Sequence, residues 1–143
     1  MVDHVIVYEL EYESKKCADI KAFNAATILI GSALEGIMLD IATQNEKIIK
    51  VLVKRNKTRK KELALHSLSL TDLLSLFKEA AIFPFDKRDD IHELYESMYD
   101  IACNIRNLIH PGRKIKAKFP KTSENEYLIL ESIYLNLKSF YYR

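Results

Sequence analysis

Residues 19–43 read DIKAFNAATILIGSALEGIMLDIAT, and apolar side chains recur in this stretch at steps of three and four residues. Such spacing places them on one face of a helix. Small residues fill much of the same stretch, and Gly31 and Gly36 lower its helix propensity, which suggests that close packing requires them. We therefore predict a central packing helix from Asp19 to about Thr43, whose buried stripe comprises Ile20, Phe23, Ala26, Ile30, Leu34, Ile37, Met38 and Ile41.

The rest of the chain shows the same spacing in several shorter stretches. We predict helices over about 46–53, from a capping Ser69 to the Phe83-Pro84 break, over about 87–109, and from Ser123 onwards. Residues 1–17 form an N-terminal arm, irregular or helical. Only three glycines and three prolines occur in 143 residues, which argues against a many-stranded sandwich. The sequence predicts one all-α domain over residues 1–143, an up-and-down bundle of four to five helices.

Composition and cysteine spacing exclude several classes of function. Cys17 and Cys103 form no CxxC pair, and we expect two reduced, buried thiols with neither a metal nor a cofactor. Asp3, His4 and Glu9 interrupt the first apolar stretch, so no signal peptide is expected. We also judge no apolar run long enough to cross a membrane. A cytoplasmic protein is therefore the default expectation.

Basic residues concentrate in two connections, although the net charge is only +2. The first is a predicted basic loop over residues 54–66, and the second follows Gly112. Either cluster could simply be solvated, or it could attract nucleic acid through the release of counterions. The candidate nucleic-acid-binding residues are Lys54, Arg55, Lys57, Arg59, Lys60, Lys61, Arg113, Lys114 and Lys116.

The segment Arg106-Asn107-Leu108-Ile109-His110-Pro111 carries the sharpest functional signal. Arg106 and His110 are four positions apart, so on a helix they share a face. Pro111 ends the helix, and the partial negative charge at a helix C-terminus favours a protonated imidazole. A guanidinium beside such an imidazole suits a phosphate. The alternative is structural: Arg106 pairs with an acid, His110 caps carbonyls and Asn107 bonds to nearby backbone.

Residues 106–112 resemble the signature of the HEPN superfamily, small helical bundles with an arginine, a polar residue and a histidine near the end of a long helix. The stretch from Ile30 to Asp40 is similar to a small-residue helix with a glutamate in some bacterial members, and the resemblance covers roughly residues 18–141. It implies a homodimer whose arginine–histidine faces meet in a cleft. It also implies metal-independent RNA cleavage, with His110 as general acid or base, Arg106 stabilising phosphorane charge and Asn107 orienting either group.

Three residues separate Arg106 from His110, at least one fewer than in the family's common ribonuclease pattern. One residue fewer rotates the histidine by about 100° around the helix axis. The segment could therefore cleave RNA, or it could bind RNA without cleaving it. Glu35 is a supporting candidate that pairs with Arg106 or is exposed, and Asp40 is expected to be solvated.

Two functions remain as expectations. The first is an RNA- or nucleotide-binding protein, in its catalytic form an endoribonuclease, in a defence or toxin–antitoxin system. The second is a non-catalytic, dimeric helical adaptor or regulator of another protein such as a nucleotidyltransferase.

Overall fold

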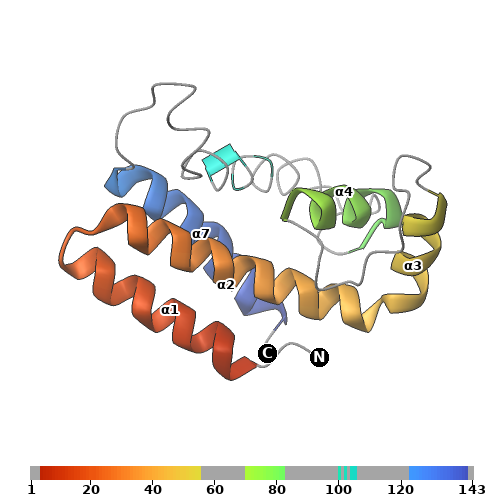
Figure 1. The fold of residues 1–143 in the computed structure, drawn as a ribbon, viewed down its shortest axis with the longest axis horizontal. Coiled ribbons are helices and arrows are strands. Elements are labelled where there is room, and N and C mark those ends of the chain that lie inside the picture. Colours follow the sequence, from red (N-terminus) through yellow and green to blue (C-terminus); the bar gives the residue numbers. More distant parts are fainter. Residues whose placement is uncertain are drawn as a thin grey trace.

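The structure, a computed structural model, describes residues 4–55, 70–82, 100, 102, 104–105 and 123–141. Within these ranges every regular element is a helix, which confirms the predicted all-α bundle (Figure 1). The elements are α1 (His4–Asp19), α2 (Phe23–Gln44), α3 (Glu46–Arg55), α4 (Leu70–Ala80) and α7 (Glu124–Tyr141). Residues 100, 102, 104 and 105 are helical as well.

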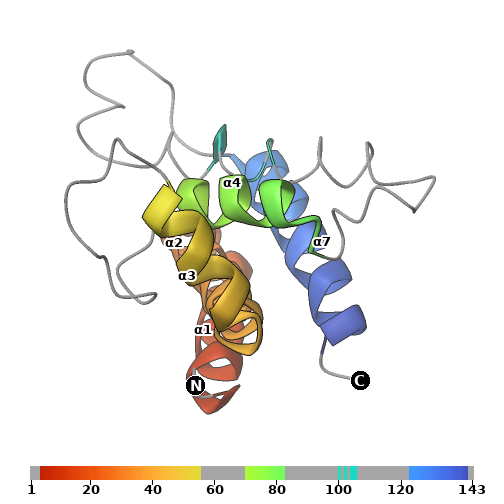
Figure 2. The ribbon, with the colours of Figure 1, turned by 90° about the vertical axis from the view of Figure 1, so that its right-hand side faces the viewer.

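Helix α2 is the centre of the bundle, as its apolar pattern predicts. Helix α1 runs antiparallel along it, and α7 and α4 pack against other sides of it (Figures 1 and 2). Figure 2 shows α4 above α2, α1 below it and α7 to one side. Helix α3 continues from α2 after a bend at Asn45 and packs against α4.

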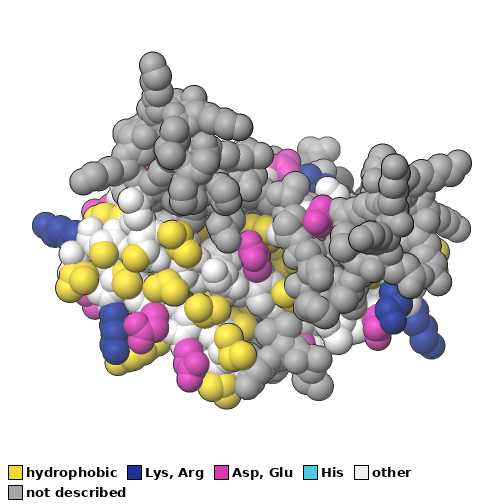
Figure 3. Space-filling model, in the orientation of Figure 1, with side chains coloured by type: hydrophobic (Ala, Val, Ile, Leu, Met, Phe, Trp, Pro, Cys, Tyr) yellow, Lys and Arg dark blue, Asp and Glu magenta, His cyan; other side chains and the backbone are white. Residues whose placement is uncertain are grey.

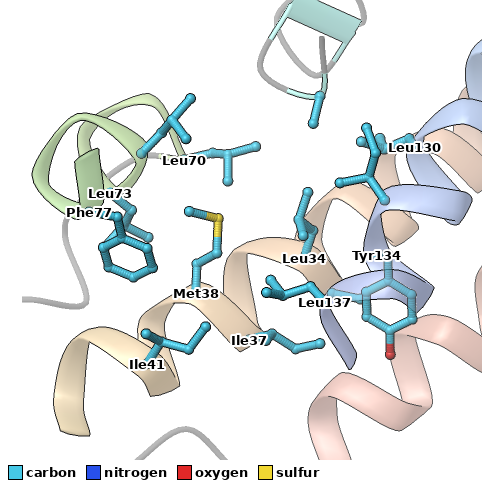
Figure 4. Packing of buried hydrophobic residues seen from close by; sticks show 14 of the residues in the cluster. Leu34, Ile37, Met38, Ile41, Leu70, Leu73, Phe77, Leu130, Tyr134 and Leu137 are labelled. Atoms are coloured by element: carbon cyan, nitrogen blue, oxygen red, sulfur yellow. The ribbon is translucent and has the colours of Figure 1, made fainter. Parts of the chain in front are cut away.

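The core is one continuous apolar cluster around α2 (Figure 4). Met38 faces Leu73 and Phe77 of α4, whereas Leu34 points towards Leu130 and Tyr134 of α7. Nearly the whole predicted stripe of α2 is buried, with Phe23 partly buried, so the helical spacing identified this core correctly. Leu130, Ile133 and Leu137 form the buried face of α7 together with Tyr127 and Tyr134.

The predicted start of α2 is wrong by four residues. Helix α1 extends to Asp19, and the chain then turns so that the amides of Lys21 and Ala22 donate to the carbonyls of Ala18 and Cys17. This pair of bonds is a Schellman motif, which satisfies carbonyls that a helix end would otherwise leave bare. Ile20, assigned to the buried stripe, lies in the turn and is 77% exposed.

Two helix ends place a non-glycine residue in the left-handed region. Lys21 after α1 has φ 60°, and Ala81 after α4 has φ 52°. At the second end the amides of Ala81 and Ile82 donate to Lys78 and Phe77. A side chain with a β-carbon is strained in this conformation, and glycine is not.

We expect Lys21→Gly and Ala81→Gly each to raise the free energy of unfolding, by about 0.5–1 kcal/mol, because relief of strain exceeds the added entropy of the unfolded chain. Urea denaturation measures the change. The matched control is Ala25→Gly, at an exposed position inside α2, where glycine should destabilise by about 1 kcal/mol. Equal destabilisation by all three substitutions would contradict this account of the helix ends.

One predicted boundary needs correction, one open alternative is decided and one boundary is confirmed. Lys54 and Arg55, assigned to the basic loop, are the last residues of α3. Of the two alternatives for the N-terminal arm, the structure shows the helical one, and this helix enters the core, since Val7 is fully buried. The start of α7 agrees with the prediction: the Ser123 amide and hydroxyl both donate to Oε2 of Glu126, which is a capping interaction.

Helix α2 also corrects the expectation that no apolar run could cross a membrane. Among the described helices it is the one that is long and apolar enough by length and composition. Most of its apolar window is buried inside the bundle, as in the core helix of a soluble protein. Burial by α1, α4 and α7 accounts for its apolar character, and the fold is compatible with a soluble protein.

Candidate functional site

Most of the predicted site lies outside the described residues. This holds for the motif residues Arg106, Asn107 and His110, and for seven of the basic candidates: Lys57, Arg59, Lys60, Lys61, Arg113, Lys114 and Lys116. The structure places the backbone of Lys54 and Arg55 at the end of α3, and it describes Glu35 on α2. The arrangement of Arg106 and His110 therefore stays a prediction, as does the pairing of Arg106 with Glu35.

The helical residues that lead into the motif are fixed to the bundle. Ala102 and Ile105 are buried and belong to the core cluster. Two positions before Ala102, the Asp100 carboxylate accepts a bond of 2.8 Å from the Lys78 ammonium on α4. Burial and the ion pair hold the chain immediately before Arg106 against the bundle.

The two acidic residues of α2 differ in burial, and one of them departs from its prediction. Glu35 is partly buried, whereas Asp40 is fully buried with 0% exposure, so the expectation of a solvated Asp40 is wrong. The second half of α2 is covered on most sides, and Asp40 lies between buried neighbours on that half. A carboxylate in such a place requires polar partners. Apolar spacing alone gave no sign of this, because Asp40 departs from the stripe.

A polar cluster between α1 and α7 was not anticipated. The Glu11 side chain is only 8% exposed, and its Oε2 accepts hydrogen bonds from the Tyr134 hydroxyl at 2.9 Å and the Lys138 ammonium at 2.7 Å. Oε1 lies 3.3 Å from the Lys15 ammonium. The Lys138 ammonium also lies 4.8 Å from the centre of the Tyr8 ring. We call these residues the Glu11 cluster.

The Glu11 cluster joins two helices that are far apart in the sequence. Burial raises the pKa of the Glu11 carboxyl, but the hydrogen bonds from Lys138 and Tyr134 outweigh it and hold the pKa below its ordinary value. The carboxylate is thus charged and satisfied. The Glu11 carboxylate therefore has a structural role, because it links α1 to α7. The one indication of the Glu11 cluster in the sequence is the helical spacing of Val7, Glu11 and Ser14, which places Glu11 on the same face of the helix as the apolar Val7.

Comparison of the chain with protein-family models, curated proteins and solved structures finds no match. Within the described ranges, no group of three or more His, Cys, Asp or Glu side chains could hold a metal ion. The Arg106–His110 segment is therefore the part of the chain whose residue types bear most directly on function.

Proposed function

We propose that this chain is a HEPN-like RNA-binding protein whose Arg106, Asn107 and His110 contact the sugar–phosphate backbone, and that it cleaves RNA without a metal ion. The observation that carries the proposal is the motif itself, a guanidinium and an imidazole four positions apart, followed by Arg113, Lys114 and Lys116. Guanidinium groups bind phosphate in a bidentate manner, and nearby cations add affinity through counterion release.

The described structure supports this proposal in two ways. The chain forms an all-α bundle, the architecture that the HEPN resemblance implies. In addition, burial of Ala102 and Ile105 and the Asp100–Lys78 ion pair fix the chain directly before Arg106. A catalytic side chain needs such support, because a loosely held group loses most of its effect on the rate.

The reaction that fits these side chains is transesterification within the RNA. The ribose 2′-oxygen bonds to the adjacent phosphorus, the bond from phosphorus to the 5′-oxygen breaks, and a 2′,3′-cyclic phosphate and a 5′-hydroxyl result. His110 takes the proton from the 2′-hydroxyl or delivers one to the leaving 5′-oxygen. Arg106 stabilises the negative charge on the phosphorane, and Asn107 orients one of these groups.

The test compares cleavage of a labelled single-stranded RNA by the wild-type chain and by His110→Ala and Arg106→Ala, in the presence of EDTA. Each substitution should lower the cleavage rate at least about 100-fold. His92→Ala is the matched control, because His92 has no partner pattern in the sequence, and it should leave the rate unchanged. The wild-type products should carry 2′,3′-cyclic phosphate ends.

Binding is measured separately, as a function of salt concentration. The affinity for RNA should fall steeply with salt, and Arg113→Gln with Lys114→Gln should reduce the slope. If His110→Ala cleaves as well as the wild type, the catalytic part of the proposal is wrong. If the wild type shows no salt-sensitive RNA binding, the RNA function is wrong, and a helical adaptor for another protein becomes the better account.

A further inference from the structure

The outward face of α1 carries an unusual order of side chains. Val5, Glu9, Tyr12, Lys16 and Ile20 follow one another at steps of three and four residues, opposite the buried Val7, Glu11 and Ser14. The amide of Ile20 still donates to the carbonyl of Lys16, so Ile20 continues this line beyond the helix. We call these five residues the α1 stripe.

The apolar members of the α1 stripe are strongly exposed. Val5 is 59% exposed, Tyr12 is 60% exposed and Ile20 is 77% exposed. Hydrophobic side chains also gather over α1 and α2 in the lower left of Figure 3, with lysine and acidic side chains set among them. A single exposed apolar residue needs no explanation, but three in line on one helix indicate a contact surface.

The α1 stripe is complementary to an identical stripe that runs in the opposite direction. Read in either direction it is an apolar residue, a charged residue, a tyrosine, a residue of opposite charge and an apolar residue. Around a centre between Tyr12 and Glu13, Glu9 and Lys16 lie about 5 Å away in opposite directions along the axis, and Val5 and Ile20 about 11 Å away. A twofold axis through this centre brings unlike charges together at both ends.

The charged contacts within one chain still allow Glu9 and Lys16 to pair with a second copy. Lys16 lies 3.9 Å from a Glu13 carboxylate oxygen and 4.4 Å from the centre of the Tyr12 ring, both on the exposed side of α1. No ion pair within the described part of the chain involves Glu9. A second copy supplies Glu9 with a lysine and gives Lys16 a second carboxylate.

We propose that α1 is a self-association surface, on which the α1 stripes of two copies of this chain pair antiparallel about a twofold axis. Val5 then packs against Ile20 of the second copy, and Glu9 forms an ion pair with Lys16 of the second copy, each contact occurring twice. This arrangement buries the three exposed apolar side chains and neutralises four charges.

The proposed contact is separate from the segment that leads into the motif. Helix α1 lies below α2 in Figures 1 and 2, whereas the helical residues 102, 104 and 105 lie above it. The inference is therefore independent of the proposed RNA function. A measurement of association can fail while RNA cleavage persists, and the reverse is also true.

The test uses charge reversal with mutual rescue, read by sedimentation equilibrium of the full chain over a range of concentrations. Glu9→Lys places lysine against lysine twice in a symmetric pair, and Lys16→Glu places glutamate against glutamate twice. Each should raise the dissociation constant of the α1 contact at least about tenfold, because two pairs change from attraction to repulsion. An equimolar mixture of the two variants should associate about as tightly as the wild type, since every Glu9–Lys16 position then regains unlike charges.

Two controls separate association from folding. Glu46→Lys changes an exposed residue that pairs with Lys50 at 2.7 Å on α3, and it should leave association unchanged. Circular dichroism should show each variant folded, and the rescue in the mixture excludes misfolding as the cause. A wild type that stays monomeric at all concentrations, unchanged association in the single variants, or no rescue on mixing would each overturn the proposal.

Discussion

Replacement of Tyr134 by alanine is expected to lower the free energy of unfolding by about 3–5 kcal/mol, the range for a buried aromatic residue. Tyr134 is fully buried on α7 and points into the core beside Leu137 (Figure 4). Its hydroxyl also donates to Glu11 on α1. The substitution thus removes packing from the bundle and one hydrogen bond between two helices.

Two variants divide this loss into its parts. Tyr134→Phe keeps the ring and loses the hydroxyl, so it should cost about 1 kcal/mol. Leu135→Ala changes the neighbouring, exposed residue of the same helix and should stay within about 0.5 kcal/mol. Urea denaturation gives all three values. Comparable losses for Tyr134→Ala and Leu135→Ala would contradict the placement of α7 in the core.

The Glu11 cluster gives the second large effect. Glu11→Gln should lower the free energy of unfolding at pH 7 by about 2 kcal/mol, because the Tyr134 hydroxyl and the Lys138 ammonium lose a charged acceptor. The partly exposed Lys138 can turn to water, which limits the loss. Glu13→Gln, on the exposed side of α1, is the control and should change stability by no more than about 0.5 kcal/mol.

The same cluster predicts a dependence on pH. The pKa of Glu11 is lower in the folded chain than in the unfolded chain, so its contribution is present above the ordinary carboxyl pKa of about 4.3. That contribution is lost as the pH falls through the folded-state pKa. Wild type should therefore lose more stability between pH 6 and pH 3 than Glu11→Gln does. Parallel stability curves would show that Glu11 is not a buried, charged acceptor.

Local apolar spacing was enough to predict the bundle and most of its core. Leu34, Ile37 and Ile41 recur with the period of a helix, and such a period predicts that one face of the helix is buried. These three residues are buried in the core. Spacing failed at Ile20, because a Schellman turn with lysine in place of glycine left no glycine signal in the sequence.

Contacts between distant residues were beyond local sequence reasoning. The partner of Glu11 at Tyr134 lies 123 positions away, and no pattern near either residue specifies the other. Burial of Asp40 depends in the same way on how the helices surround α2. The Arg106–His110 segment lies outside the described residues, so its role rests on its residue types and on the HEPN resemblance.

The imidazole signals of the four histidines, followed by NMR as RNA is added, test the central functional claim most directly. A 2′-O-methyl oligonucleotide serves as the probe because it binds without being cleaved, and His110→Ala identifies the His110 signal. The account predicts that the His110 signal shifts in step with RNA binding while the His92 signal does not, and that Arg106→Ala weakens the shift. RNA binding that leaves the His110 signal unmoved would contradict it.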